Sequence, residues 1–419
     1  MAVLGVIAEF NPFHNGHQHL ISQARQAHNF DAVICVMSGN FVQRGEAAIC
    51  NKWARAHMAL HAGADLVIEI PACFCIRSAY YFALGALQLL DRTRVVTHLA
   101  FGSESGRLDE LGAIAAMIGN ESQAYKHHLK SCLAQGLSYP SARARAIESI
   151  TGPHLTGIGS ILGQPNNILG IEYLRVLEQE RIPIEPLTIP RIGSGYKSLD
   201  FSTMASASAI RHCLLNDRGN IAIAATMMPA AAFALLQQEV ESGRAPVATT
   251  DLSQVLLAKL RMIQPDHLRQ IYEVAEGLEN RILKAGMTCG TWEELRDSIK
   301  SKRYSLTRIN RLLLYILLDL QNRQIHDFDQ HGPLYIHTLG FSPKGRKILQ
   351  AIKNKSSLRI LNRGSAVKAA AEDKDAEVLR DMLRLDVLAT DLYCLLYPQA
   401  RQRYGARDFT TSPQLVIDE

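Results

Sequence analysis

The fold of this chain is decided by residues 3–17, VLGVIAEFNPFHNGH. The apolar run Val3–Ala8 predicts a buried strand, and the residues after it predict a turn that leads into a helix. His14 and His17 are three residues apart around Gly16, so both imidazoles can face one anion while the glycine permits close backbone approach. Open α/β sheets bind ligands beyond the carboxyl ends of their strands. The pattern favours a triphosphate site; two unrelated histidines in a turn, or a metal site, remain the alternatives.

The same alternation of apolar runs and helical patterns continues along the first half of the chain. Further strands are predicted at Asp31–Met37, Ala64–Ile70, Val95–Phe101 and Ile184–Ile189. Helices are predicted at His17–Asn29, Lys52–Ala62, Ala79–Asp91 and Asn167–Glu180, and from near Ser206. Near-continuous apolar strands joined by helices are typical of a parallel sheet that is covered on both faces. The predicted fold class is therefore α/β, followed by a mostly α-helical C-terminal domain.

The periodicity changes at two places. A helical insert is predicted near residues 108–160, and after Asp217 the pattern is mainly helical. The clearest segments there are Leu252–Met262, Leu268–Leu278 and Leu306–Leu320, with a candidate strand at Leu334–Leu339. We therefore predict two domains, residues 1–216 with the insert and residues 217–419.

The composition is that of an ordinary globular protein, with 419 residues, 47% hydrophobic, 20% charged and a formal net charge of +5. The sequence has neither a signal peptide nor an apolar run of about 18–20 residues, so we expect a cytoplasmic protein without a membrane span. Eight scattered cysteines without a CxxC pair predict reduced thiols. We expect no metal site in the protein, and interpret the pair His57 and His61 as structural.

A second candidate phosphate motif is SASAIR, residues 206–211. Ser206, Ser208 and Arg211 lie at a predicted helix start, where they can bind the β- and γ-phosphates. An ordinary serine N-cap is the alternative. The pairing of this motif with HNGH resembles the nucleotidyltransferase superfamily that includes the class I aminoacyl-tRNA synthetases. The resemblance implies a Rossmann-like parallel-sheet nucleotidyltransferase domain in which His14 and His17 are catalytic and stabilise attack on the α-phosphate.

Longer strings carry a closer resemblance. They are EFNPFHNGH (9–17), SGNFVQRGE (38–46), KWAR (52–55), GADLV (63–67), FGSE (101–104), PNNILG (165–170) and RIGSGY (191–196). Together they resemble the tRNA(Met) cytidine acetate ligase family over most of the chain. The resemblance implies that acetate and ATP form acetyl-adenylate, whose acetyl group passes to the wobble cytidine of elongator tRNA(Met) to give N(4)-acetylcytidine.

The resemblance also implies the ATP contacts. They are Ile7, Ala8, Glu9, Phe10, Asn11, Pro12, Phe13, His14, Asn15, Gly16, His17, Gln18, His19, Leu20, Gly102, Asn166 and Arg191. The local chemistry agrees, because Gly102 follows a strand, Asn166 can present an amide to adenine, and Arg191 follows another strand end. Helix capping by Asn166 and a surface ion pair of Arg191 are the alternatives. Mg²⁺ is expected as the counter-ion of ATP.

Two further surfaces are predicted. Asn40, Gln43 and Arg44 form a polar loop suited to acetate or a phosphate, and Lys52 and Arg55 either face tRNA or form a solvated helix face. Between residues 296 and 363 we count fourteen Lys or Arg against four Asp. Basic residues interleaved with an aromatic suit an RNA backbone and loop bases. The predicted tRNA contacts within this cluster are Lys302, Arg303, Tyr304 and Arg308.

Two other functions remain open at this point. A nucleotidyltransferase that makes a dinucleotide or another small cofactor explains both phosphate motifs, but it leaves the basic helical half without a task. A non-catalytic nucleotide sensor or RNA-binding protein is the other alternative, although the pair His14 and His17 speaks against it. No stable protein partner is inferred.

Overall fold

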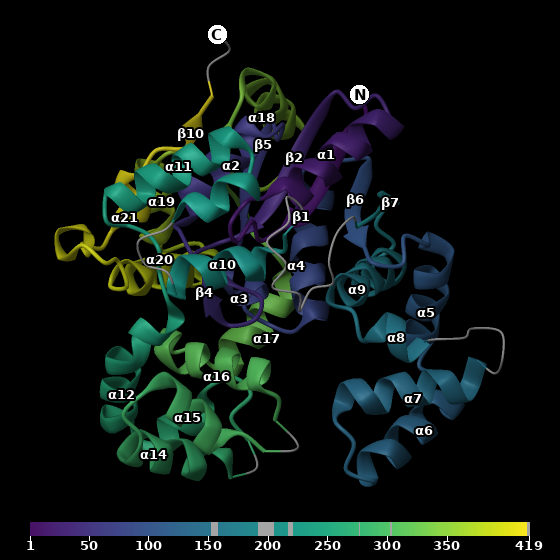
Figure 1. The fold of residues 1–419 in the computed structure, drawn as a ribbon, viewed down its shortest axis with the longest axis vertical. Helices are drawn as coiled ribbons and strands as arrows, with labels where there is room; N and C mark the ends of the chain where they lie inside the picture. The colour runs from purple at the N-terminus through teal and green to yellow at the C-terminus, as the bar shows by residue number, and fades with distance from the viewer. Residues whose placement is uncertain (152–157, 192–204, 217–220, 276, 302–303, 417–419) are drawn as a thin grey trace.

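The computed structural model describes residues 1–151, 158–191, 205–216, 221–275, 277–301 and 304–416. Over these residues, eight strands form one sheet in the order β10-β8-β5-β2-β1-β6-β7, with β9 paired to β8 (Figure 1). Five of them run parallel: β1 (Val3–Ala8), β2 (Ala32–Ser38), β5 (Leu66–Ile70), β6 (His98–Ser103) and β7 (Glu185–Pro190). The predicted α/β fold class is confirmed.

Side chains alternate between two apolar cores on the two faces of the sheet. In β2, Val33 and Cys35 belong to one core, whereas Ile34 and Val36 belong to the other. The first core is covered by α1 (Asn15–Ala27), α2 (Lys52–His61), α10 (Ala207–Asn216) and α11 (Ala230–Glu241). The second is covered by α4 (Ala79–Arg92), α9 (Pro165–Gln179), α18 (Pro343–Lys355) and α20 (Glu377–Cys394). Burying each Val or Ile contributes about 1.5–3 kcal/mol, which fixes the strand register.

The C-terminal half adds three strands to this sheet. The strand β8 (Tyr335–Phe341) pairs antiparallel with β5, and both β9 (Arg359–Leu361) and β10 (Gln414–Leu415) pair with β8. The sheet therefore draws strands from both sides of the predicted boundary at residue 216. The candidate strand Leu334–Leu339 corresponds to β8.

Two helical lobes extend from one end of the sheet (Figure 1). The insert contributes α5 (Leu108–Asn120), α6 (Gln123–Ala134), α7 (Tyr139–Thr151) and α8 (Ile158–Leu162). The other lobe contains α12 (Ser253–Met262), α13 (Pro265–Gln270), α14 (Leu278–Thr288), α15 (Trp292–Ile299) and α16 (Leu306–Leu318). Within the described ranges no helix is both long and apolar enough to cross a membrane.

The predicted helix Leu268–Leu278 is wrong. The chain leaves the helical path at Ile271, which forms a β-bridge with Gln321, and the amide of Tyr272 donates to the carbonyl of Leu320 at 2.8 Å. Glu273 has a positive φ of 63°, which a right-handed helix does not allow. A tertiary contact with the chain after α16 therefore overrides the local periodicity.

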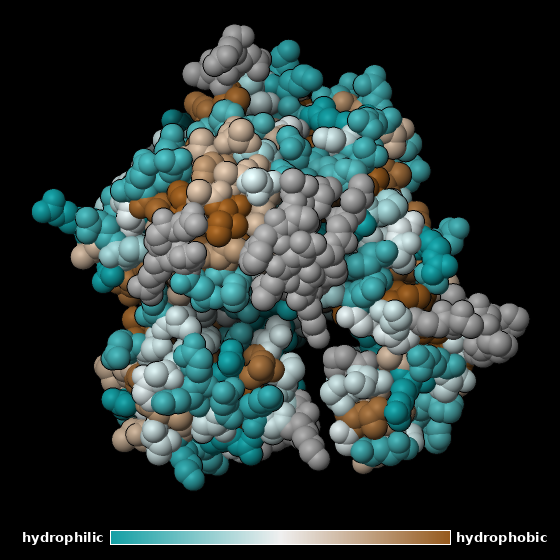
Figure 2. Space-filling view, viewed as in Figure 1, coloured by the Kyte–Doolittle hydropathy of each residue, from teal (hydrophilic) through white to brown (hydrophobic). Residues whose placement is uncertain are grey.

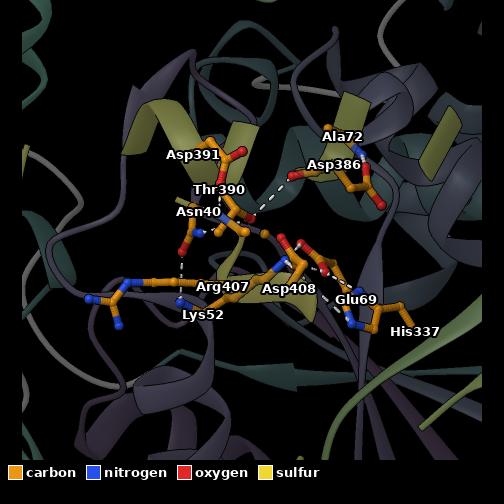
Figure 3. A network of polar contacts seen from close by, with 12 residues as sticks. Asn40, Lys52, Glu69, Ala72, His337, Asp386, Thr390, Asp391, Arg407 and Asp408 are labelled. Atoms are coloured by element: carbon orange, nitrogen blue, oxygen red, sulfur yellow. Dashed lines mark hydrogen bonds and ion pairs between the residues drawn. The ribbon is translucent and has the colours of Figure 1, made fainter. Parts of the chain in front are cut away.

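A buried polar network joins the ends of the chain (Figure 3). The ammonium of Lys52 lies 2.8 Å from Glu69 Oε2 and 2.6 Å from Asp408 Oδ1, and His337 Nδ1 lies 2.7 Å from the same Glu69 oxygen. Burial alone would lower the pKa of Lys52, but the two carboxylates raise it above its usual value. Lys52 and Arg55 are both 0% exposed, so the prediction of a tRNA-facing or solvated surface for them is wrong.

Candidate active site

A cavity of about 1530 Å³ lies at the carboxyl ends of β1 and β6. The strand order changes direction there, since β2 and β6 flank β1 on opposite sides, and such a switch point is where open α/β sheets bind ligands. The sheet end, the insert and the lobe of α12–α16 all contribute to its walls. Figure 2 shows the hollow between the two lobes.

Most of the predicted ATP contacts line this cavity. They are Ile7, Ala8, Glu9, Phe10, Asn11, His14, Gly16, His17, His19, Leu20, Gly102, Asn166, Arg191, Ser206, Ser208 and Arg211. The remaining four, Pro12, Phe13, Asn15 and Gln18, are not among its lining residues. Phe13 is 0% exposed and packs at 4.8 Å from the ring of Phe10, so it supports the turn from behind.

The two histidines form the N-terminal cap of α1. The backbone amide of Gly16 donates to His14 Nδ1 at 3.0 Å, and the amide of His14 donates to His17 Nδ1 at 3.2 Å. Because each Nδ1 is an acceptor, each neutral ring carries its hydrogen on Nε2. The rings are stacked with centroids 3.8 Å apart. The cap therefore sets both tautomers and leaves two Nε2–H donors that can bind an oxyanion.

Burial and neighbouring charges keep these imidazoles neutral in the protein without ligand. Burial, together with the positive charges of Arg191 and Arg211, lowers the pKa of His14 to about 3. Burial and the neighbouring His14 lower the pKa of His17 well below its usual value. The positive potential of the site therefore comes from the guanidinium groups, while the histidines contribute directional hydrogen bonds.

Arg55 holds the loops after β1 and β2 in place from below the cavity. Its guanidinium donates to the carbonyls of Glu9 at 2.6 Å and Ser38 at 3.1 Å, and also to the carbonyl of Gly39. The carboxylate of Glu9 accepts a hydrogen bond from the amide of Gln43 at 2.9 Å, and burial raises its pKa. The predicted solvated arginine is thus a structural support of the site.

The second candidate phosphate motif contains a serine N-cap and also contacts the turn before His14. Ser206 Oγ accepts from the amide of Ala209 at 3.2 Å, as an N-cap does. Arg211 donates to Ser208 Oγ at 3.3 Å and to the carbonyl of Asn11 at 2.8 Å. The motif is therefore tied to the turn before His14, although about 200 residues separate them in the sequence.

Gly102, Asn166 and Arg191 all line the cavity, and Gly102 and Arg191 lie side by side at the ends of β6 and β7. A Cβ added at Gly102 would lie 3.3 Å from Arg191 Cγ, so a larger residue would displace that arginine. The side-chain amide of Asn166 donates to Glu104 at 2.6 Å, and the Asn167 amide donates to the other Glu104 oxygen at 2.8 Å. Sequence reasoning missed Glu104 as a positioning residue, although the string FGSE placed it directly after a strand.

The polar loop after β2 divides between two environments. Gln43 and Arg44 line the cavity, whereas Asn40 is 2% exposed and does not. The side chain of Asn40 accepts from the amide of Lys52 at 2.8 Å and donates to Thr390 Oγ1 at 3.3 Å. It therefore faces the C-terminal helices, away from the acetate or phosphate site predicted for it.

The predicted basic cluster does not form one surface. Lys300, Tyr304, Arg308 and Arg311 line the cavity, and the guanidinium of Arg308 lies 4.8 Å from the centroid of the Tyr304 ring. The basic residues of α18 are not among the lining residues, and α18 lies at the far end of the sheet (Figure 1). Lys302 and Arg303, two of the predicted tRNA contacts, lie outside the described residues.

The fold and the cavity define a nucleotidyl transferase, and the family model described as HIGH nucleotidyl transferase matches residues 1–408. The tRNA(Met) cytidine acetate ligase of Syntrophomonas wolfei subsp. wolfei is 54% identical over 413 residues, which are 99% of each chain. That of Halothermothrix orenii is 41% identical over 416 residues, 98% of each chain. The crystal structure of Thermotoga maritima TmcAL bound with alpha-thio ATP has a TM-score of 0.90 and 34% identity, and covers 100% of both chains. The chain therefore belongs to the HIGH nucleotidyl transferase family and, within it, to the tRNA(Met) cytidine acetate ligases.

Proposed function

We propose that this protein is a cytoplasmic, ATP-dependent ligase that acetylates the wobble cytidine of elongator tRNA(Met). A carboxylate oxygen of acetate attacks the α-phosphorus of ATP, and pyrophosphate leaves. The exocyclic amine of the cytidine then attacks the acyl carbon of acetyl-adenylate. AMP leaves, the amine loses a proton, and N(4)-acetylcytidine is formed.

The observation that carries the proposal is the pair of Nε2–H donors of His14 and His17 at the end of β1. Their Nδ1 atoms are occupied by backbone amides, so the donors are oriented before ATP binds. Oriented donors stabilise the charge that develops on the α-phosphate without reorganisation, and in many enzymes such stabilisation contributes more to the rate than any other effect. Arg211 and Ser208, tied to the same turn, are suited to the departing pyrophosphate.

Mg²⁺ fits this site as a counter-ion bound mainly by phosphate and water. Three of the cavity carboxylates have other partners: Glu104 accepts from Asn166, Glu172 from Arg143 at 2.7 Å, and Glu273 from Arg308 at 2.8 Å. The one group of three potential metal ligands found in the described part of the chain is Glu69, His337 and Asp408. None of those three lines the cavity. When bound, the ion would neutralise charge on the triphosphate.

We assign the binding of ATP and acetate to the carboxyl end of the sheet, and the binding of RNA to the two helical lobes. The cavity lining includes the exposed residues Lys300 and Tyr139, which come from the two different lobes, and the half-buried residues Tyr304 and Arg308. Aromatic rings and cations in such an arrangement suit a splayed loop nucleotide, whose base is already partly unstacked. The acid pocket is assigned to the Gln43 and Arg44 loop, beside Glu9.

The decisive experiment is acetate-dependent exchange of labelled pyrophosphate into ATP, first without tRNA. The ligase predicts exchange, whereas an enzyme that makes a dinucleotide predicts none with acetate and a nucleotide sensor predicts none with any acid. Labelled acetate should then enter an elongator tRNA(Met) transcript, but not a transcript whose wobble cytidine is replaced by uridine. Absence of exchange in folded protein that still binds ATP would contradict the proposal.

A further inference from the structure

Arg311 is a buried cation on the wall of the cavity that faces the sheet end. It lies on α16, is 9% exposed and lines the cavity. Its Nε has no hydrogen-bond partner among the residues that the structure describes. Other cavity arginines on the lobes and on α9 form ion pairs: Arg308 pairs with Glu273, and Arg143 and Arg175 both pair with Glu172. Arg311 forms no ion pair with any residue of the described ranges.

An arginine stays charged at every physiological pH, and a buried charge without a partner costs several kcal/mol. Packing alone does not require a guanidinium at this position, because an apolar side chain of similar volume would fill it at lower cost. A cation that is nine-tenths buried, unpaired in the described chain and open to a ligand cavity is therefore matched to an anion that arrives from outside.

The surroundings of Arg311 indicate which anion it binds. The triphosphate motifs lie on the sheet end, where Arg191 and Arg211 supply the positive charge. Arg311 instead shares the lobe wall with Lys300 and with the Tyr304–Arg308 pair. Gly45 packs directly on its backbone, because a Cβ added there would lie 2.5 Å from the Arg311 amide nitrogen. Arg311 thus stands where the loop after Gln43 meets the lobe, between the acyl-transfer region and the RNA-facing wall.

We propose that Arg311 binds a phosphodiester group of the RNA substrate next to the target nucleotide, and so positions the exocyclic amine for attack. The inference rests on the proposed function and adds to it a named contact deep inside the cavity. A guanidinium fork matches two phosphate oxygens, whereas an ammonium does not. Arg311 is accordingly a positioning residue, whose loss leaves activation of the acid intact.

The test uses the full-length protein with Arg311→Met, which removes the charge at similar volume, and Arg311→Lys, which keeps the charge without the fork. The matched control is Arg346→Met on α18, an exposed arginine that does not line the cavity. For each variant we would measure acetate-dependent pyrophosphate exchange, the affinity for tRNA as a function of salt, and kcat/KM for acetyl transfer to tRNA.

For Arg311→Met we expect unchanged exchange and a fall of about 10- to 100-fold in kcat/KM for transfer. The slope of log affinity against log salt concentration should decrease by the amount expected for about one phosphate contact. In Arg311→Lys, part of the affinity should be recovered. The control should match the wild type. A raised acetate requirement in exchange, with tRNA affinity and salt slope unchanged, would assign Arg311 to the acid and overturn the inference. Absence of exchange in the wild type would count against the proposed function, while the salt slope would still decide the role of Arg311.

Discussion

The ammonium of Lys52 lies 2.6 Å from a carboxylate oxygen of Asp408, although 356 positions separate the two residues. Both side chains are almost fully buried, at 0% and 1% exposed. Lys52 opens the helix that follows the loops of the site, and Asp408 belongs to α21 (Arg407–Thr410) near the end of the chain. The C-terminal segment is therefore part of the support of the nucleotide domain.

Asp408→Ala should lower the free energy of unfolding by about 3–5 kcal/mol, because it leaves the buried Lys52 with Glu69 as its remaining carboxylate partner. Urea denaturation followed by fluorescence or circular dichroism would measure the loss. The exposed Asp375 provides the control, and Asp375→Ala should change stability by less than about 0.5 kcal/mol. Equal effects of the two substitutions would show that the network does not hold the C-terminus.

His17→Ala should reduce acetate-dependent pyrophosphate exchange by about 100- to 1000-fold, since it removes one of two oriented donors to the transition state. His28→Gln, at the exposed C-terminal end of the same helix, should leave the rate unchanged. Steady-state exchange at saturating ATP separates this loss from weaker binding. A rate within a factor of a few of the wild type would remove His17 from the chemistry.

The parallel strands were predictable from the sequence to within three residues at each end, because β1, β2 and β5 are short apolar runs and β6 and β7 keep apolar residues between turn residues. The pairing of β8 with β5 was not predictable, since it depends on contacts across more than half of the chain. Lys52 and Arg55 illustrate the same limit. Charged residues at a helix start predict exposure to solvent, unless distant carboxylates and carbonyls are known to surround them.

The candidate active site shows the same contrast between what a local sequence pattern predicts and what depends on the folded structure. The spacing of His14 and His17 was enough to predict an anion site, and the structure places both rings at the cavity. Their tautomers depend on two backbone amides whose positions follow from the cap geometry of α1, which spacing does not reveal. Asn40 and Gln43 flank the two-residue strand β3 (Phe41–Val42), yet one faces the C-terminal helices and the other the cavity.

The stability of the ATP-free protein should fall as the pH decreases from about 6.5 toward 3. The folded state lowers the pKa of His14 to about 3, so over this range the unfolded chain binds a proton that the folded chain does not. Between pH 6.5 and 5, the contribution of His14 amounts to about 2 kcal/mol. Thermal melts of the wild type and His14→Asn should therefore converge as the pH falls. The exposed His127→Asn should parallel the wild type at every pH, and parallel curves for His14→Asn would contradict the assignment.

Gly102→Val should raise the ATP concentration needed for half-maximal exchange by about tenfold, because the new side chain displaces Arg191. Gly112→Ala is the control: a Cβ there meets nothing within 4 Å, and alanine favours the helix α5. Its kinetics should equal those of the wild type, with equal or higher thermal stability. If Gly102→Val bound ATP normally, the nucleotide would have to lie away from the end of β6.

The edge strand β10 and Asp408, one of the two carboxylates that neutralise Lys52, both follow strands β1–β9 in the sequence. Until they emerge from the ribosome, β8 lacks one of its neighbours and a lysine in the core has lost one of its two counter-charges. An uncovered sheet edge can pair with another chain, and a buried charge that has lost one of its partners destabilises the native state. We therefore expect a chain truncated before Arg407 to be less stable than the full chain and more available to proteases.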